Sequence, residues 1–340
     1  MFRSLVCLHS ALDGAFFWEQ RAVAIARLVH WQLRTTSLYS FRRSIHRIEK
    51  GLATRPRREV FAADYIGETV AFLGLLAEAY EEGCTEYRED IAWGATALRA
   101  YFAAVKGEDR VEHAREAFQR LALPAGLVAN GGEGGVVRPK MPEYGFGIAD
   151  LLHLARTRHS IRDYLDRPVP RDVIDAAISV AIESPSACNR QAFSFRVFDE
   201  PDLVREVAKI PIGIDHADHQ IPVLVVLVGN LGAYPEPRDR HLIYIDVSLA
   251  AMAFVFGLQV QGVASCCVNW PDIHEREKRM QELLGLASTE RPVMLVTAGY
   301  LDPEGFAPSS AKRSLEEMRV YNRTVAGGSA HRAGDRVRTP

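Results

Sequence analysis

The sequence has few cysteines, and their spacing excludes a zinc site or a redox pair built on a Cys-x-x-Cys motif. It also has no excess of charge: the net charge of −2 over 340 residues gives no general attraction to nucleic acid or to an anionic membrane. We interpret the cysteines as free thiols of a reducing compartment, and the adjacent Cys266 and Cys267 as buried thiols, because a disulfide between neighbours is strained. We expect no metal site. The five cysteines are Cys7, Cys84, Cys188, Cys266 and Cys267.

Long uninterrupted apolar runs are missing as well. The most apolar window, Leu242 to Val260, approaches the length of a membrane span but contains Asp246, Ser248 and Gln259 and has no basic flank. We therefore expect a buried central helix and no membrane span. The first residues show no small-residue cleavage site after their short apolar stretch, which predicts no signal peptide and a cytoplasmic protein.

Two folded regions are predicted on either side of a segment rich in glycine and proline. Residues 1–125 carry apolar side chains at three- and four-residue spacing, which predicts an all-α N-terminal extension. Residues 126–145 cannot hold regular structure and are predicted to be a linker. Residues 146–324 alternate helix and strand patterns. Residues 325–340, rich in Gly, Ala and Arg, are predicted to be a disordered tail.

The second region is predicted to be an α+β fold. Dense β-branched runs such as Ile221 to Val228 indicate buried strands, and amphipathic segments between them indicate helices. Helices on both faces of a mixed sheet would form a three-layer sandwich. The predicted strands are 193–198, 221–228 and 292–300, with a turn and strand over 262–270. The predicted helices are 150–156, 170–183, 201–210, 241–261, 274–284 and 316–323.

A short basic segment, Arg158-His159-Ser160-Ile161-Arg162, lies between two predicted helices, and we call it the Arg158 motif. Arginine offers a planar fork of donors to phosphate, and Ser160 and His159 add single hydrogen bonds. A phosphate needs several such donors at short range, so the pattern indicates a phosphate site. A solvated basic loop is the alternative.

A polar loop from Pro185 to Gln191 connects a predicted helix to a predicted strand, and we call it the Pro185 loop. Proline and alanine present small, flat surfaces to an aromatic ring, and the amides of Asn189 and Gln191 both donate and accept hydrogen bonds. This composition suits a flavin ring. The alternative is an ordinary connection in which these two amides hold the loop shape. We interpret Cys188 as a bystander thiol.

Together the two segments resemble the flavin-binding signatures of the nitroreductase family of FMN enzymes. Their pieces follow the family's order, with a proline-valine helix start at Pro168-Val169-Pro170 between them. The resemblance covers about residues 146–324 and implies a nitroreductase-like sandwich with a mixed, mainly antiparallel sheet. It also implies that the FMN-binding residues are Arg158, His159, Ser160, Arg162, Pro185, Ser186, Ala187, Asn189 and Gln191.

The same resemblance assigns two further groups of cofactor-binding residues. The segment from Gly262 to Trp270 is similar to a family turn whose backbone N–H groups face the N5 and O4 edge of the flavin, which points to Val268 and Asn269, with Trp270 beside them. Lys312 and Arg313 resemble a late basic pair that closes over the FMN phosphate. The family spaces that pair by one residue, whereas here the two are adjacent, so both remain candidates.

The implied activity is two-electron transfer by FMN in a homodimer, with two sites at the interface that are each built from both subunits. NADH or NADPH would reduce the flavin, and a small-molecule acceptor, such as a nitroaromatic, a quinone or an unknown biosynthetic compound, would then bind with ping-pong kinetics. No catalytic side chain is expected, because the cofactor carries the chemistry. Two alternatives stay open: a non-reductive flavoenzyme of the same fold, such as an oxidative tailoring enzyme, and a non-enzymatic binding module with a vestigial flavin site.

Two clusters outside the motifs also have open interpretations. The segment from Phe41 to Arg58 holds seven basic residues and one acid, so it would meet an anionic partner, form a solvated helix face, or pair with the acidic stretch from Glu81 to Glu89. A second polar cluster precedes the strand that begins at Ile221, and it consists of Asp215, His216, Asp218 and His219. It would serve as a metal or acid/base site, or it would have a structural role or lie at the rim of the substrate cavity. The N-terminal extension would cap the substrate pocket, add to the dimer interface or dock a partner.

Overall fold

The computed structural model describes residues 14–32, 37–127, 135–137, 141–214 and 220–322. The chain forms two compact units, residues 1–307 and 308–340. The predicted linker is described only in part, and the predicted tail, residues 325–340, lies outside the described residues. The predicted domain boundaries therefore stay predictions.

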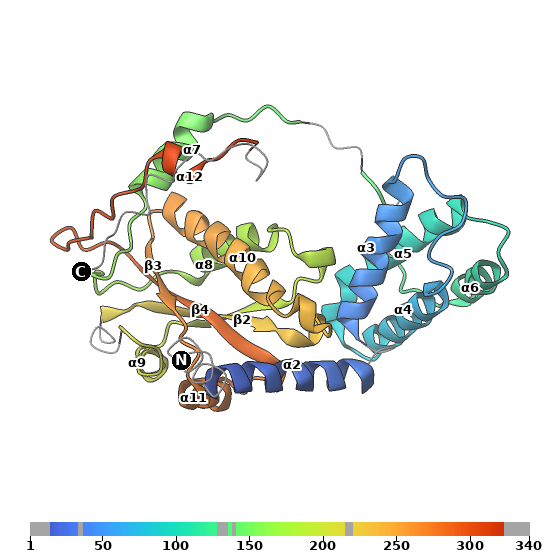
Figure 1. The fold of residues 1–340 in the computed structure, drawn as a ribbon, viewed down its shortest axis with the longest axis horizontal. Helices are drawn as coiled ribbons and strands as arrows, with labels where there is room; N and C mark the ends of the chain where they lie inside the picture. Colours follow the sequence, from blue (N-terminus) through green and yellow to red (C-terminus); the bar gives the residue numbers. More distant parts are fainter. Residues whose placement is uncertain (1–13, 33–36, 128–134, 138–140, 215–219, 323–340) are drawn as a thin grey trace, which may run out of the picture. The chain divides into compact units, whose positions relative to one another are not determined.

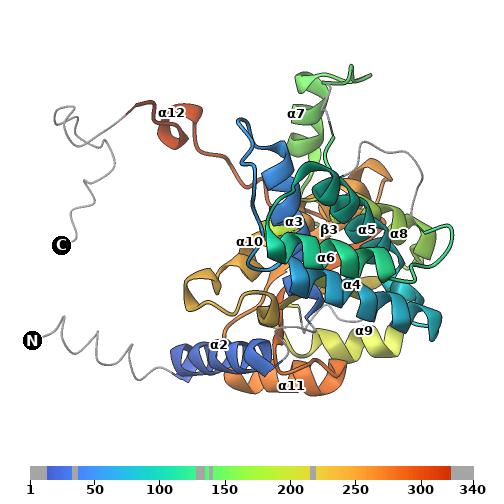
Figure 2. The same ribbon diagram turned by 90° about the vertical axis from the view of Figure 1, so that its right-hand side faces the viewer.

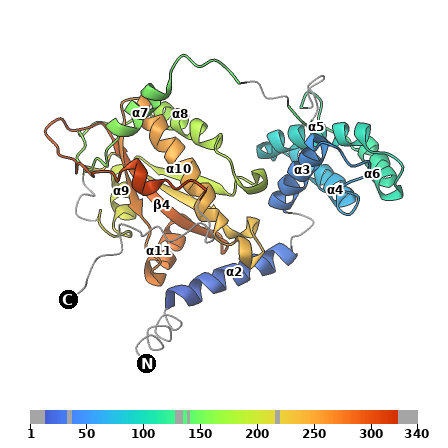
Figure 3. The ribbon, with the colours of Figure 1, turned by 45° about the horizontal axis from the view of Figure 1, so that its top comes forward.

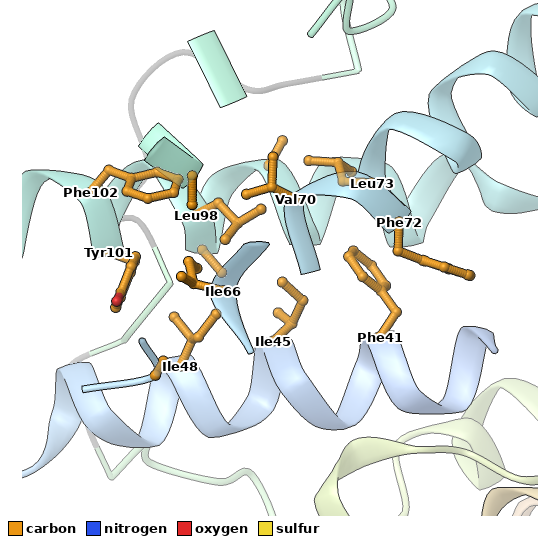
Figure 4. Packing of buried hydrophobic residues seen from close by; sticks show 14 of the residues in the cluster. Phe41, Ile45, Ile48, Ile66, Val70, Phe72, Leu73, Leu98, Tyr101 and Phe102 are labelled. Carbon is orange, nitrogen blue, oxygen red and sulfur yellow. The ribbon is translucent and has the colours of Figure 1, made fainter. Parts of the chain in front are cut away.

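The N-terminal part of the first unit is helical, and four of its helices share one apolar core. Phe41, Ile45 and Ile48 lie on one face of helix α3, because residues three and four apart share a side of a helix, and this face is buried against α4 and α5 (Figure 4). The four helices form one cluster in Figures 2 and 3. Their bounds are α3 Leu38–Ala53, α4 Ile66–Glu81, α5 Arg88–Ala104 and α6 Asp109–Arg120.

Helix α2, Gly14–Gln32, precedes this cluster and packs elsewhere. Its Val23 and Ala26 are buried beside Leu231 and Tyr234, which lie just after the second strand of the sheet. The N-terminal extension therefore contributes to two cores, one of its own and one that it shares with the second half of the chain.

The second half of the first unit contains a four-stranded sheet with the order β1-β2-β4-β3, and all three strand pairs are antiparallel. One isolated parallel bridge, Ser160 to Ser265, adds the Arg158 motif at the outer edge of β3. The predicted mixed, mainly antiparallel sheet is confirmed. The strands are β1 Phe193–Phe198, β2 Val223–Asn230, β3 Ala264–Asn269 and β4 Glu290–Gly299.

Helices cover both faces of this sheet, which confirms the predicted three-layer sandwich (Figure 1). The run from Val223 to Val228 sends alternate side chains to opposite faces, because the side-chain period of a strand is two. Val223 and Val225 pack against α8 and α10, whereas Leu224 and Val226 pack against α9 and α11. These helices are α8 Arg171–Ile182, α9 Pro201–Ala208, α10 Leu242–Val260 and α11 His274–Leu284.

Helix α10 is the long apolar segment noted in the sequence. In the part of the chain that the structure describes, Pro237–Val260 is the one helical stretch with the length and composition of a membrane span, and half of its most apolar window is buried inside the protein. Gly257 allows a close approach to α8, since a Cβ atom there would lie 2.9 Å from the Cα of Ala177. These features are those of the predicted buried central helix.

Candidate functional site

The Arg158 motif follows helix α7, Ile148–Thr157, and is fixed against the outer edge of β3. The Ile161 amide donates to the Ser265 carbonyl at 3.1 Å. The buried Tyr164 hydroxyl donates to the Ile161 carbonyl at 2.7 Å and lies 2.8 Å from the Thr297 hydroxyl of β4. Burial raises the pKa of Tyr164, so the phenol stays protonated and the motif is held by neutral hydrogen bonds.

Most hydrogen-bond donors of the two arginine side chains in this motif have no partner within the described protein. Among the described residues neither Arg158 nor Arg162 forms an ion pair, and the one hydrogen bond of Arg162 is to the Ser160 carbonyl, at 3.3 Å. Arg158 and Ser160 are half-buried, whereas His159 and Arg162 are exposed. Unpaired guanidinium groups beside a serine hydroxyl are the donor set that a phosphate requires, so these residues fit the phosphate of FMN.

The outer edge of β3 presents backbone groups next to this motif. Because the Ser265 carbonyl points outward to Ile161 and consecutive strand residues alternate in direction, Cys267 and Asn269 also direct their N–H groups outward. The same alternation turns the amide of Val268 toward β4, and its side chain is buried in the core. Of the two residues predicted at this edge, Asn269 therefore has the available amide.

The prediction that Cys266 and Cys267 are both buried is wrong for Cys267. Cys266 is buried, but Cys267 is exposed, because neighbouring side chains of a strand point to opposite faces. The surrounding protein partly desolvates the sulfur of Cys267, which raises its pKa together with the neighbouring Cys266, and the charge of Arg158 opposes that shift. The exposed thiol is thus electrostatically coupled to the Arg158 motif.

The Pro185 loop has an unusual backbone. It contains a short 3-10 turn, Ala187–Asn189, and three of its residues have positive φ: Cys188 at 56°, Asn189 at 50° and Gln191 at 49°. For residues other than glycine such conformations cost on the order of 1–3 kcal/mol each, so the surrounding structure must hold them. Ser186 supplies part of that support, since its hydroxyl accepts a hydrogen bond from the Gln191 amide at 2.9 Å.

The buried carboxylate of Asp246, in helix α10, supports the Pro185 loop. Both oxygens of Asp246 lie 3.2 Å from the Ala187 amide, which donates to them, and the Tyr234 hydroxyl donates to the same carboxylate. Burial raises the pKa of Asp246, while the Tyr234 and Ala187 hydrogen bonds and the charge of Arg190 oppose the rise. Asp246 was visible in the sequence only as an acid within an apolar helix.

Two arginines complete the support. Arg190 is buried, donates to the Ala187 carbonyl at 3.2 Å and lies over the Tyr234 ring at 4.8 Å. Arg42 reaches the loop from α3: its Nε donates to the Asn189 carbonyl at 2.9 Å, and another nitrogen donates to the Gln191 side-chain oxygen.

Arg42 is itself paired with Asp90 of α5, and both side chains are nearly buried. The basic segment of the extension therefore supplies a structural arginine to the Pro185 loop. The predicted pairing of that segment with the acidic stretch from Glu81 to Glu89 is not among the ion pairs of the described residues, where Asp90 takes that role instead.

The two motifs lie at opposite ends of α10 in one chain. Ala187 contacts Asp246 in the second turn of the helix, whereas Ser160 lies beside Ser265, after the helix has ended. The 14 residue-to-residue steps from Asp246 to Val260 span roughly 21 Å at about 1.5 Å per step. Pro185 is exposed and Ser186 to Asn189 are half-buried, so the loop still presents a surface to a ligand.

Two further groups were predicted from the sequence, one in the second unit and one outside the described residues. Lys312 and Arg313 belong to the second unit, where both are exposed and Arg313 lies 3.8 Å from Glu317 of the short helix α12, Leu315–Met318. Ser314 caps that helix by accepting from the Glu317 amide at 3.3 Å. The polar cluster of Asp215, His216, Asp218 and His219 falls outside the described residues.

Comparisons with known proteins place similarity in the second half of the chain. Residues 155–215 and 211–300 match the model of the Nitroreductase family. The chain is 26% identical over 205 residues to an NADH dehydrogenase of Thermus thermophilus, covering 51% of this chain and 97% of that protein. It is 22% identical over 199 residues to iodotyrosine deiodinase 1 of Pongo abelii, covering 50% and 68% respectively. A solved nitroreductase family protein of Streptococcus pneumoniae is 22% identical, with a TM-score of 0.44, covering 51% of this chain and all of its own.

Proposed function

Residues 155–300 of this chain belong to the nitroreductase family, and from this premise we propose that the protein is an FMN-dependent oxidoreductase. In this proposal NADH or NADPH is the electron donor, and a nitroaromatic, a quinone or an unknown biosynthetic compound is the acceptor. Donor and acceptor use one pocket in turn, which gives ping-pong kinetics.

The observation that carries the proposal is the pair of unpaired arginines at the open edge of β3. Arg158 and Arg162, with the Ser160 hydroxyl and His159 beside them, would hold the FMN phosphate. The outward amide of Asn269 would donate to the N5 and O4 edge of the ring, where negative charge develops. When bound, FMN supplies two-electron transfer at N5, so no side chain of the protein need act as an acid, a base or a nucleophile.

The Pro185 loop would contact the flavin ring from a second copy of the chain. Its separation from the Arg158 motif along α10 favours a site built from two subunits over one built within a single chain. An apolar stripe on α10 supports a homodimer: Ile245, Leu249 and Met252, at helical spacing, are each more than 40% exposed. The position of Lys312 and Arg313 over the phosphate stays a prediction.

The described cysteines are all free thiols, which supports the proposal of a reducing, cytoplasmic location. The helical extension contributes to the site indirectly, because Arg42 holds the Asn189 carbonyl and the Gln191 side chain of the Pro185 loop.

The deciding experiment is an absorption spectrum of the purified protein followed by anaerobic titration with NADH and with NADPH. A flavin spectrum that bleaches stoichiometrically, and FMN released on denaturation, are the expected results. The Arg158→Ala/Arg162→Ala variant should lose flavin and turnover. A double variant that stays fully loaded and active would refute the phosphate assignment, and a colourless protein that refuses added FMN would refute the flavin function.

A second candidate is a flavoenzyme of the same fold with a different reaction. Its support is the similarity of half of this chain to iodotyrosine deiodinase 1, which by its name acts on an iodinated tyrosine. Iodotyrosine should then be consumed by the reduced protein faster than a nitroaromatic. Bound FMN that neither NADH nor NADPH can reduce, together with oxygen-dependent turnover of a metabolite, would instead favour an oxidative enzyme.

A further inference from the structure

A pocket of about 540 Å³ lies in the helical extension, beside the C-terminal half of α3, and the chain that follows the helix forms its opposite wall. The flavin proposal assigns none of its lining residues. The side chains that matter for its chemistry are Arg47, Lys50, Arg58, Phe61, Asp64 and Tyr65.

The pocket is positively charged. Three cations face one acid, and among the described residues Arg47, Lys50 and Arg58 form no ion pair. Lys50 lies in the last turn of α3, where a cation complements the helix dipole, but Arg47 and Arg58 have no such explanation. The pocket therefore carries a net positive charge that an anionic ligand would neutralise.

The neighbouring Arg43 lies near one of these cations, Arg47, and near Arg190. Partial burial lowers the pKa of Arg43, and the charges of Arg190 and Arg47 lower it further. Like charges held near one another destabilise the folded protein, and a bound anion would relieve the repulsion.

Two aromatic rings line the pocket. The Arg47 guanidinium lies 4.0 Å from the centre of the Tyr65 ring, which orients its donors. The Phe61 ring packs edge-on against Tyr101 at 5.2 Å and lies directly on α3 at Gly51, where a Cβ atom would be only 2.3 Å from the ring. Tyr101 also donates to the Phe61 carbonyl at 2.6 Å.

We propose that this pocket binds a phosphorylated small molecule with a planar ring, of the class of nucleoside mono- and diphosphates. Arg47, Lys50 and Arg58 would bind the phosphates, and the rings of Phe61 and Tyr65 would contact the base. The volume lies within the range of roughly 300–1,000 Å³ typical of small-molecule sites. The inference is independent of the flavin function, since the pocket lies in the N-terminal extension, outside the segment that matches the Nitroreductase family.

A small ligand explains the pocket better than a nucleic acid does. The cations line one pocket instead of forming a track along the surface, and Asp64 in the wall would repel a continuous phosphate backbone. The net charge of −2 also gives the chain no general attraction to polyanions.

Isothermal titration of the full chain, loaded with FMN at the flavin site and then freed of excess FMN by gel filtration, tests the proposal. The probes are ADP, adenosine and inorganic phosphate. ADP should bind, and adenosine should bind at least about tenfold more weakly because it lacks the phosphates that the cations contact. Arg47→Gln/Lys50→Gln should weaken ADP by at least about tenfold, since each lost charge-assisted hydrogen bond approaches that factor.

Matched variants separate binding from folding. Arg57→Gln removes one exposed charge next to the lining and should leave ADP affinity unchanged. Tyr65→Leu should weaken ADP but not phosphate, and Tyr65→Phe should restore ADP binding; all variants should have wild-type circular dichroism spectra. The proposal is overturned if no probe binds, if adenosine equals ADP, if Arg57→Gln weakens ADP as much as the double variant does, or if a single-stranded oligonucleotide binds more tightly than ADP.

Discussion

Arg42 of the helical extension donates a hydrogen bond to the side chain of Gln191, although 149 positions separate the two in the sequence. The same guanidinium binds the Asn189 carbonyl and the carboxylate of Asp90. One nearly buried arginine thus connects the extension to a loop whose backbone is strained at three positions. The extension is therefore part of the support of the candidate flavin site and not merely a domain attached to it.

Replacing Arg42 by methionine should destabilise the protein by about 3 kcal/mol. The substitution leaves the Asp90 carboxylate buried without its partner, which is the costly way to break such a pair. It also removes the donors to Asn189 and Gln191, so we expect weaker FMN binding. Urea unfolding and a flavin titration measure the two effects.

Arg171 provides the control for this variant. It pairs with Asp199 at 2.6 Å through two hydrogen bonds, but its side chain is 74% exposed. Arg171→Met should cost less than about 1 kcal/mol, because solvent screens an exposed pair. Equal losses in the two variants would show that Arg42 has no special structural role.

The elements of the fold were largely predictable, because each depends on local patterns. The strand Phe193–Phe198 and the helix His274–Leu284 were predicted with both ends, since alternation and amphipathic spacing are clear there. The last helix was predicted over residues 316–323 but spans only Leu315–Met318. Its polar sequence gives little burial to stabilise a longer helix.

The candidate site was predictable in composition but not in geometry. Nothing in the sequence indicates positive φ at Cys188 or Gln191, because such residues reach that region only when tertiary contacts hold them. The contact with Arg42 depends on a pairing between distant segments that no local pattern records. Asp246 was noticed as an acid in an apolar helix, but its partners, Tyr234 and the Ala187 amide, come from the fold.

The stability difference between Asp246→Asn and the wild type should depend on pH. Burial raises the pKa of Asp246 above the ordinary value of 3.8, so the folded state holds a proton where the unfolded state has released it. The contribution of Asp246 to the free energy of unfolding is then fully present below about pH 4, and it is lost as the pH rises through the pKa of the folded state. The asparagine variant cannot titrate, so its stability relative to the wild type should increase as the pH rises above about 4.

Asp199 supplies a control of opposite sign. Its hydrogen bond from Arg171 lowers its pKa, so its contribution is present above the ordinary value and is lost as the pH falls. Chemical unfolding at several pH values should therefore give opposite slopes for Asp199→Asn and Asp246→Asn, neither steeper than about 1.4 kcal/mol per pH unit for one proton. Parallel slopes would contradict the assignment for Asp246.

FMN should protect Cys267 from alkylation. The thiol is exposed beside the Arg158 motif, so a cofactor bound at the open edge of β3 would cover it. Labelling needs a pH near or above about 8.5, because only the thiolate reacts and the pKa of Cys267 is raised. Mass spectrometry should show several-fold slower labelling of Cys267 with FMN present and no change at Cys84 in the helical extension. Unchanged labelling of Cys267 in a protein that demonstrably holds FMN would place the cofactor elsewhere.

Leu249→Glu should separate the protein into monomers and abolish flavin binding. The residue lies in the middle of the exposed apolar stripe of α10 and is 44% exposed, so a buried carboxylate there would destabilise an interface formed by that stripe. Light scattering should give twice the chain mass of 37.8 kDa for the wild type and the single mass for the variant.

Leu75→Glu is the matched control, since Leu75 is 47% exposed on α4, away from the stripe. It should remain dimeric and bind FMN. Because the Arg158 motif and the Pro185 loop of one chain are separated by most of α10, a monomer should lose the flavin even with both motifs intact. A monomeric Leu249→Glu variant that retains stoichiometric FMN would show that one chain alone completes the site.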